Sequence, residues 1–466
     1  MRAVWLLFAT AVAATKRYGI VFDAGSSGTR IHVYTWNTGG GGPKDAFDLV
    51  SDDLLKIKPG LSAYKDKPGE AGASLAQLME FAKTKIPASE VANTPMFLMA
   101  TAGLRMVGES AKDAILASVC SYLKGTGYLF KCEWATLLGG RDEGLYGWVT
   151  VNYLLNALYP GGAEPAGVID LGGGSVQIVF PTAAAKPPSA PADLVQTLDF
   201  GGRKHPLYVK SHLGFGLDAA RSAVLDLAVT RTAKEPVIHP CLPNGSELTH
   251  KGVSVKGGGD HHKCKKLVKK IFGDDECVFG KHHCSFKGVY QPALPKTFYG
   301  FSYMFDRTAA IGLLDGTPKK YGTARMSRDD IEHASKATCA LDLAATKTKF
   351  AAAEDAAKAV NFCGDAVYLE VLLDELGFSD DTVLTMTNKI GDVELVWTLG
   401  AMLAKSAELA NGGGGGGGGG FSAMSLAAML LAGAGLWYFC CGPGSKPAGP
   451  LKLYNKAATT PTAHPL

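Results

Sequence analysis

The sequence predicts an α/β fold of two related lobes that face each other across a cleft, followed by one C-terminal transmembrane helix. Two glycine-rich turns with the same layout predict the lobes: DAGSSG begins at Asp23 and DLGGGS begins at Asp170. Each turn follows an apolar, β-branched run and precedes a second such run, as in a β-hairpin. The turns begin 170 − 23 = 147 residues apart, about one domain's length. An uncharged segment near the end of the chain predicts the transmembrane helix.

The first lobe is expected over residues 16–160. The long segment over residues 137–159 is expected to be a turn that opens a helix, which Pro160 and the glycines after it terminate. A hairpin, a helix, a strand and a second helix are expected before it, over residues 18–34, 74–85, 95–100 and 111–123.

The second lobe is expected over residues 161–390. Its hairpin at Asp170 is followed by residues 182–290, which are rich in proline at 187–191, contain cysteines and are predicted to be rich in loops. Helices are expected around residues 326–375 and over residues 393–409.

Both turns have the composition of a phosphate site. Glycines let backbone N–H groups converge on an anion, and hydroxyl side chains add hydrogen-bond donors. A carboxylate beside phosphate requires a cation between them, so Asp23 and Asp170 predict Mg²⁺ or Ca²⁺, held by oxygen and through water. For one turn alone, an ordinary hairpin with an aspartate cap is an equal alternative. The residues expected to bind phosphate are Ser26, Ser27, Gly28, Gly172, Gly173, Gly174 and Ser175.

Glu143 is the candidate for activating water. It lies in the turn that opens the helix after residue 140, and a helix N-terminus favours a charged carboxylate. We therefore expect Glu143 to be ionised and able to accept a proton from water. The alternative is a capping residue, and spacing alone does not decide between the two.

Both ends of the chain carry apolar segments. Residues 1–15 combine Arg2, a short apolar run and small residues, which is typical of a secretory signal peptide. Residues 421–441 carry no charge, and at about 1.5 Å per residue they span roughly 31 Å, the thickness of a bilayer's hydrocarbon core.

The segments that flank residues 421–441 set the expected topology. Residues 411–420 include nine consecutive glycines and are predicted to be a flexible tether. Residues 442–466 contain three lysines and no acidic residue, so they are expected to be cytosolic. The sequence thus predicts a single-pass type I membrane protein, with its lobes luminal or extracellular, in the Golgi or at the plasma membrane.

Eight of the ten cysteines precede the tether, which predicts four disulfides in an oxidising compartment. Cys120–Cys132 and Cys339–Cys363 are the expected local pairs. The histidines and cysteines over residues 261–284 leave a zinc site as an alternative. Asn244 begins a glycosylation sequon, Asn-Gly-Ser.

Overall charge excludes one class of partner. Lys and Arg exceed Asp and Glu by 47 − 43 = 4, too little to argue for nucleic-acid binding. Five lysines over residues 263–270 lack interleaved aromatics and are predicted to form a solvated helix face. The sequence leaves the oligomeric state open.

Five segments occur in the order found in the apyrase (nucleoside triphosphate diphosphohydrolase) family: DAGSSGTR, ATAGLR, GGRDEGLYGW, DLGGGSVQI and VWTLGAML. Residues 18–405 therefore resemble this family of the actin, Hsp70 and sugar-kinase superfamily. The resemblance implies two ribonuclease-H-like lobes that flank a nucleotide cleft, with residues 391–410 returning to the first lobe. It also implies hydrolysis of the terminal phosphate of nucleoside tri- or diphosphates, with a divalent cation.

The resemblance assigns roles to single residues near the reacting phosphate. Glu143 resembles the catalytic base, and Ser175 and Gln177 resemble residues that orient the attacking water. Thr101 and Ala102 align with a segment near the terminal phosphate. Asp23 and Asp170 correspond to the carboxylates that hold the hydrated metal.

Two further points concern the nucleotide. Gly28 is a departure, because many animal cell-surface members carry histidine there. Residues 298–308 resemble the segment that supplies a base-stacking aromatic, which would be Phe305 or Tyr303; an aromatic there is as readily part of a core.

Other functions remain open on the sequence alone. An exopolyphosphatase-like phosphatase shares a turn of the DxGGGS type, and a kinase of the same superfamily would require a second substrate pocket. A membrane-tethered nucleotide-binding glycoprotein without activity is the alternative from a different class.

Overall fold

The computed structural model describes residues 14–410, apart from 26, 41–43, 183–189, 192, 232–234, 281–282, 315–320 and 354–355. The predicted tether, transmembrane helix and tail lie outside these residues, as does the predicted signal peptide except for its last two residues. No helix in the described part of the chain is long and apolar enough to cross a bilayer.

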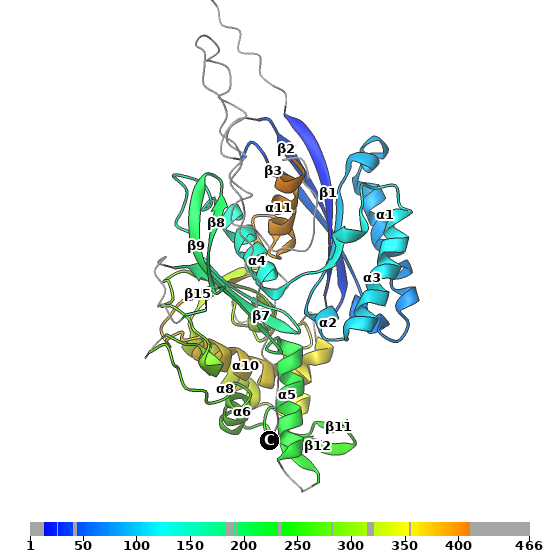
Figure 1. Ribbon diagram of the computed structural model, residues 1–466. Coiled ribbons are helices and arrows are strands. Elements are labelled where there is room, and N and C mark those ends of the chain that lie inside the picture. Colours follow the sequence, from blue (N-terminus) through cyan, green and yellow to red (C-terminus); the bar gives the residue numbers. More distant parts are fainter. Residues whose placement is uncertain are drawn as a thin grey trace, which may run out of the picture. The chain divides into compact units, whose positions relative to one another are not determined.

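The first sheet contains the hairpin at Asp23. Its order is β3-β2-β1-β4-β5; the pairs β3–β2 and β2–β1 are antiparallel, and the pairs β1–β4 and β4–β5 are parallel (Figure 1). The strands are β1 (Thr15–Ala24), β2 (Thr29–Thr38), β3 (Asp48–Ile57), β4 (Met96–Ala100) and β5 (Ala135–Leu137).

The second sheet contains the hairpin at Asp170, and its order is β14-β15-β13-β6-β7-β9-β8. Its strands β9-β7-β6-β13-β15 repeat the order and the relative directions of the first sheet. The predicted hairpins β1–β2 and β6–β7 are therefore equivalent elements of two similar sheets. The strands are β6 (Gly167–Leu171), β7 (Ser175–Pro181), β8 (Val195–Phe200), β9 (Arg203–Leu213), β13 (Phe298–Ser302), β14 (Thr323–Met326) and β15 (Leu384–Thr387).

Two helices, α4 (Gly140–Leu154) and α11 (Thr398–Ala410), lie between the two sheets (Figure 1). The helix α4 packs on β6, β7 and β9, while α11 packs on α4 and on β1. One buried cluster continues through these layers and includes Val21, Trp148, Val179 and Leu399. The sheets are thus joined by a shared core.

Other helices cover the outer faces of the sheets. The first sheet is covered by α1 (Ala76–Lys85) and α3 (Glu109–Lys124). Beside the second sheet lie α5 (Leu217–Thr230), α6 (His261–Lys269), α7 (Tyr303–Ala310), α8 (Arg328–Cys339) and α10 (Phe362–Glu375). Smaller elements are α2 (Ala102–Arg105), β10 (Val237–His239), β11 (Glu247–His250), β12 (Val253–Gly257), α9 (Leu343–Lys349), β16 (Lys389–Ile390) and β17 (Val393–Glu394).

Most elements expected in residues 18–159 are present, whereas the strands and helices within the loop-rich segment 182–290 were not predicted. That segment holds β8, β9, α5, α6 and a small three-stranded sheet of order β10-β12-β11. The sequence of β9 is RKHPLYVKSHL. It does not show the alternation of apolar and polar residues that indicates a strand, because histidine and proline interrupt the apolar positions. Tertiary pairing with β7 and β8 determines the strand.

All eight cysteines before residue 410 form disulfides. The expected pairs Cys120–Cys132 and Cys339–Cys363 are confirmed. The others are Cys241–Cys264 and Cys277–Cys284, so the cysteines of the alternative zinc site are used in disulfides. The described residues contain no cluster of three or more metal-binding side chains.

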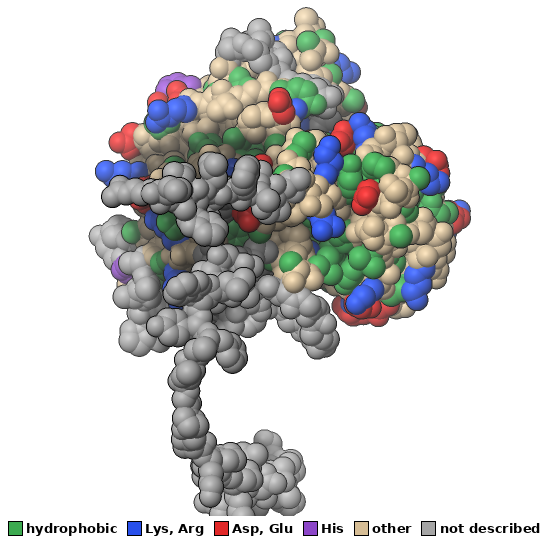
Figure 2. Space-filling view, turned by 90° about the horizontal axis from the view of Figure 1, so that it is seen from above, with side chains coloured by type: hydrophobic (Ala, Val, Ile, Leu, Met, Phe, Trp, Pro, Cys, Tyr) green, Lys and Arg blue, Asp and Glu red, His purple; other side chains and the backbone are tan. Residues whose placement is uncertain are grey.

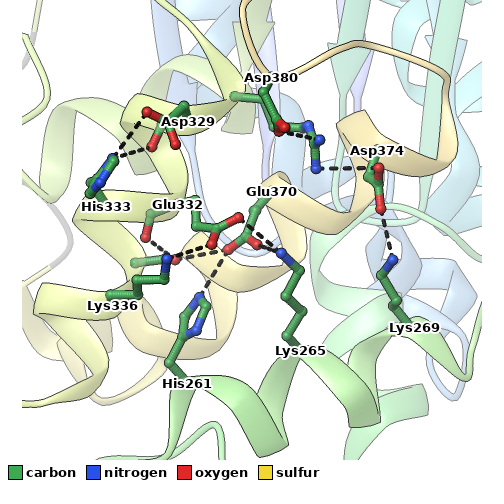
Figure 3. A network of polar contacts seen from close by, with 12 residues as sticks. His261, Lys265, Lys269, Asp329, Glu332, His333, Lys336, Glu370, Asp374 and Asp380 are labelled. Carbon is green, nitrogen blue, oxygen red and sulfur yellow. Dashed lines mark hydrogen bonds and ion pairs between the residues drawn. The ribbon is translucent and has the colours of Figure 1, made fainter.

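Four of the five lysines over residues 263–270 are exposed, as the predicted solvated helix face requires, and Lys265 is half-buried. Lys265 forms ion pairs with Glu332 and with Glu370, and the Glu370 side chain is fully buried (Figure 3). Lys269 Nζ lies 2.8 Å from Asp374 Oδ2. These pairs attach α6 to α8 and α10. Elsewhere, on the face seen in Figure 2, acidic and basic side chains are interspersed.

Candidate active site

A cleft of about 680 Å³ opens between the two sheets, at the ends of β1 and β6. It is lined by both glycine-rich turns, by the starts of α2 and α4, by one side of α7 and by the segment 394–397. Trp397 lies in that last segment and is 3% exposed. Residues far apart in the sequence therefore meet in one cleft.

The two glycine-rich turns close in the same way. Gly25 N donates to Gly28 O over 3.0 Å, and Gly172 N donates to Ser175 O over 3.0 Å. Among the predicted phosphate-binding residues, Ser27 and residues 172–175 line the cleft, whereas Gly28 lies behind the lining. Ser26 lies outside the described residues.

Glycine is required at position 174 because the two halves of the site touch there. A Cβ at Gly174 would lie 2.7 Å from Ala102 Cβ and 2.8 Å from Met106 Cε. Ala102 begins α2 and, with the buried Thr101, lines the cleft. The second turn thus packs directly on the segment that the sequence associates with the terminal phosphate.

Glu143, Ser175 and Gln177 are brought together. Gln177 Nε2 donates to Ser175 Oγ over 2.7 Å and to Glu143 Oε2 over 3.3 Å. Gln177 is fully buried on β7 behind the cleft, whereas Glu143 and Ser175 line it. Glu143 Oε1 accepts no hydrogen bond from the described residues and is the oxygen available to water.

Arg105, which the sequence analysis missed as a site residue, holds Glu143. Its Nη2 donates to Glu143 Oε2 over 2.6 Å and lies 3.4 Å from Ser175 Oγ. Arg105 is the last residue of ATAGLR, and a cationic side chain at the end of that segment could have identified it as a site residue.

Burial of Glu143 opposes the ionisation that its place at a helix N-terminus favours. Burial raises its pKa to about 8; the Arg105 guanidinium opposes this shift, and the carboxylates of Asp170 and Asp23 add to it. The helix N-terminus is too weak to offset the loss of solvation.

Asp23 and Asp170 lie one residue before the ends of β1 and β6 and are 4% and 5% exposed. Arg30 Nη1 donates to Asp23 Oδ2 over 2.8 Å. Burial raises the pKa of Asp170 to about 7, and the nearby Asp23 adds to that shift, whereas a hydrogen bond from Ser302 opposes it. Two crowded, buried carboxylates with oxygen donors alone fit a hard divalent cation, because it would neutralise their charge.

Ser302 is a second residue that the sequence analysis did not identify. It ends β13, lines the cleft and has φ of 55°, a value that a residue with a side chain rarely adopts. Such strained positions concentrate at functional sites. Ser211 of β9 is a third, because it accepts a hydrogen bond from Gln177 Nε2 over 3.1 Å; no sequence signal indicated it.

The two candidates for base stacking are placed differently. Phe305 is 1% exposed, packs in the interior and does not line the cleft. Tyr303 lines the cleft, and its hydroxyl donates to Asp218 Oδ2 over 3.3 Å. Of these two candidates, Tyr303 is therefore the one that lines the cleft, as Tyr321 and Trp397 also do.

Relatives and solved structures match most of the chain. The chain is 32% identical over 418 residues to "Probable apyrase 6" of Arabidopsis thaliana, covering 84% of this chain and 72% of that protein. It is 34% identical over 404 residues to the human "Nucleoside diphosphate phosphatase ENTPD5", covering 84% and 87%. It is similar in fold to a nucleoside triphosphate hydrolase of Neospora caninum, with 17% identity, a TM-score of 0.61, and 84% and 93% coverage.

A family model describes nearly all of the part that carries these features. The model of the GDA1/CD39 (nucleoside phosphatase) family matches residues 10–412, which include both turns, α2, α4 and α11. Together with the relatives above, this match shows that the chain belongs to the GDA1/CD39 (nucleoside phosphatase) family.

Proposed function

We propose that this protein hydrolyses the terminal phosphate of nucleoside tri- or diphosphates, using water activated by Glu143 and a divalent cation. The observation that carries the proposal is the cluster of Glu143, Ser175 and Gln177 beside two phosphate-type turns in one cleft. The names of the relatives, an apyrase and a nucleoside diphosphate phosphatase, support the same substrate class.

In the proposed reaction, water attacks the terminal phosphorus in line with the bond that breaks. Ser175 and Gln177 orient the water, whose proton passes to Glu143 as the new P–O bond forms. The bridging P–O bond breaks, and its oxygen leaves with the nucleoside phosphate. The two turns hold the phosphate chain through backbone N–H groups and hydroxyls.

Asp23 and Asp170 are the residues that would hold Mg²⁺ or Ca²⁺. When bound, such an ion neutralises phosphate charge that would otherwise be repelled by the two carboxylates. Arg30 fixes the orientation of Asp23, and Ser302 that of Asp170.

The repeated strand order supports two ribonuclease-H-like lobes, over residues 16–160 and 161–390, with residues 391–410 returning to the first. We further propose that the protein is a type I membrane glycoprotein with these lobes luminal or extracellular. The four disulfides, which persist in oxidising compartments, and the exposed Asn244 support that placement.

The test is phosphate release by residues 16–410 from nucleoside tri-, di- and monophosphates and from polyphosphate, with and without excess chelator. Glu143→Gln is expected to lower turnover about 10²–10⁴-fold, because it removes the proton acceptor. Glu164→Gln, at a side chain 94% exposed, is the matched control and should retain full turnover. Near-full activity of Glu143→Gln, or activity that survives the chelator, would contradict the mechanism. Release from polyphosphate alone would favour the exopolyphosphatase alternative.

A further inference from the structure

Lys56, near the end of β3, lies beside the first glycine-rich turn and lines the cleft. It is paired with Arg30 in the β2–β3 register. A Cβ at Gly28 would lie 3.2 Å from Lys56 Cε and 2.7 Å from Ile57 O. The Lys56 side chain therefore packs against the turn at Gly28, where any residue larger than glycine would collide with it.

The Lys56 ammonium forms no ion pair or hydrogen bond with any described residue. Arg30 differs, because it donates to Asp23 over 2.8 Å. Partial burial lowers the pKa of Lys56, and the positive charge of Arg30 lowers it further. The carboxylates of Asp306 and Asp23 oppose this lowering of the pKa but do not cancel it, so a further anion beside the ammonium would stabilise its charge.

Lys56 and Glu143 lie beside different turns of the cleft. The Lys56 side chain borders the first turn at Gly28, whereas Glu143 is linked to Ser175 of the second turn through Gln177 and Arg105. A phosphate chain held by both turns would therefore place one phosphate beside Glu143 and another beside Lys56.

We propose that Lys56 binds the phosphate group that stays on the nucleoside after hydrolysis. The inference rests on the proposed function. An ammonium at this position adds a charge-assisted contact to the leaving phosphate, where negative charge develops as the bridging bond breaks. This contact requires glycine at position 28, because a side chain there would displace Lys56.

Product inhibition distinguishes loss of the contact between Lys56 and the product's phosphate from a general disturbance of the active site. Lys56→Met is expected to weaken inhibition by the nucleoside monophosphate product about 10–100-fold, because a charge-assisted contact is lost. Inhibition by inorganic phosphate, which mimics the transferred group, should change less than twofold. Lys56→Arg should restore monophosphate affinity to within about threefold, because it keeps the charge. Calorimetric titration with nucleoside monophosphate measures the same contact without turnover.

The matched control is Lys124→Met, an exposed lysine at the end of α3 far from the cleft lining. Lys56→Gln replaces Lys56→Met if the latter does not fold, as judged by its melting temperature. Unchanged monophosphate affinity in the folded variant, or equal weakening of monophosphate and inorganic phosphate, would overturn the inference. A wild-type protein that hydrolyses no nucleotide but loses monophosphate affinity on Lys56→Met would refute the proposed function while retaining this site.

Discussion

At the scale of single residues, the site is built on a buried carboxylate whose charge depends on one neighbour. Glu143 is 7% exposed, and burial raises its pKa to about 8. The Arg105 guanidinium, 2.6 Å from Oε2, opposes that rise, so it favours the ionised form that accepts a proton. Arg105 also contacts Ser175 and hence orients the pair.

Replacing Arg105 should move the pH dependence of activity. In the wild type, kcat/KM is expected to rise to a plateau near or below pH 8, because a bound divalent cation lowers the pKa of Glu143 further. Arg105→Met removes a charge that lowers this pKa, so the rising limb should shift about 1–3 pH units upward. Activity at pH 7 should fall about tenfold or more and recover partly by pH 9.

The pH profile of kcat/KM between pH 6 and 9.5 provides the measurement. Arg17→Met, at an exposed position of β1, is the control and should leave the limb in place. A uniform loss of activity at every pH would show that Arg105 acts without changing the ionisation of Glu143.

At the scale of elements, ion pairs around one buried acid hold α6 against α8 and α10. Glu370 on α10 is fully buried and contacts Lys265 and His261 of α6 and Ser335 of α8 (Figure 3). The disulfide Cys339–Cys363 also connects α8 to α10, and Cys241–Cys264 connects α6 to the segment after β10. Charge pairing therefore aligns helices whose apolar faces alone leave their orientation less defined.

Removing one member of this cluster should destabilise the fold. Lys265→Met leaves the Glu370 carboxylate buried without its ammonium partner, and the free energy of unfolding is expected to fall by about 3 kcal/mol. Urea unfolding followed by circular dichroism measures this change. Lys263→Met, on the same helix at a side chain 75% exposed, should leave the unfolding midpoint almost unchanged. Equal midpoints for the two variants would show that the buried pair contributes little.

At the scale of the whole molecule, α4 and α11 pack so closely that they join the two sheets into one core. Gly400 N donates to Thr150 Oγ1 over 2.8 Å, and a Cβ at Gly400 would lie 2.1 Å from Tyr146 O. Tyr146 is one turn of α4 beyond Glu143, so the packing of these helices also sets the position of the proton acceptor.

A methyl group at Gly400 should therefore affect both stability and activity. Gly400→Ala forces the two helix backbones apart, and a loss of about 1–3 kcal/mol in unfolding free energy is expected. Turnover should fall as well, because Glu143 moves with α4. Gly69→Ala is the control, since a Cβ there meets no atom within 4 Å. Wild-type stability of Gly400→Ala would mean that the helices can separate at no cost.

Local sequence patterns predicted many of the secondary-structure elements and several of the residues in the cleft. Turn glycines and helical periodicity predicted both hairpins, α1, α3 and β4. Family-like motifs predicted that Glu143, Ser175 and Gln177 lie together. Three features were not predicted, because each depends on partners far away in the chain: the strands in residues 182–290, the packing of α6, and the contact of Arg105 with Glu143.

The sequence by itself determined which residue types stand at the two turns and which carboxylate opens α4, and it indicated that eight cysteines form disulfides. Only the tertiary structure decided the ionisation of Glu143, the approach of Arg105 and the position of Lys56 over Gly28. The physical reason is that burial and charge proximity are properties of the packed chain: a pKa near 8 for Glu143 arises from solvent that neighbouring elements exclude and from charges that other elements supply.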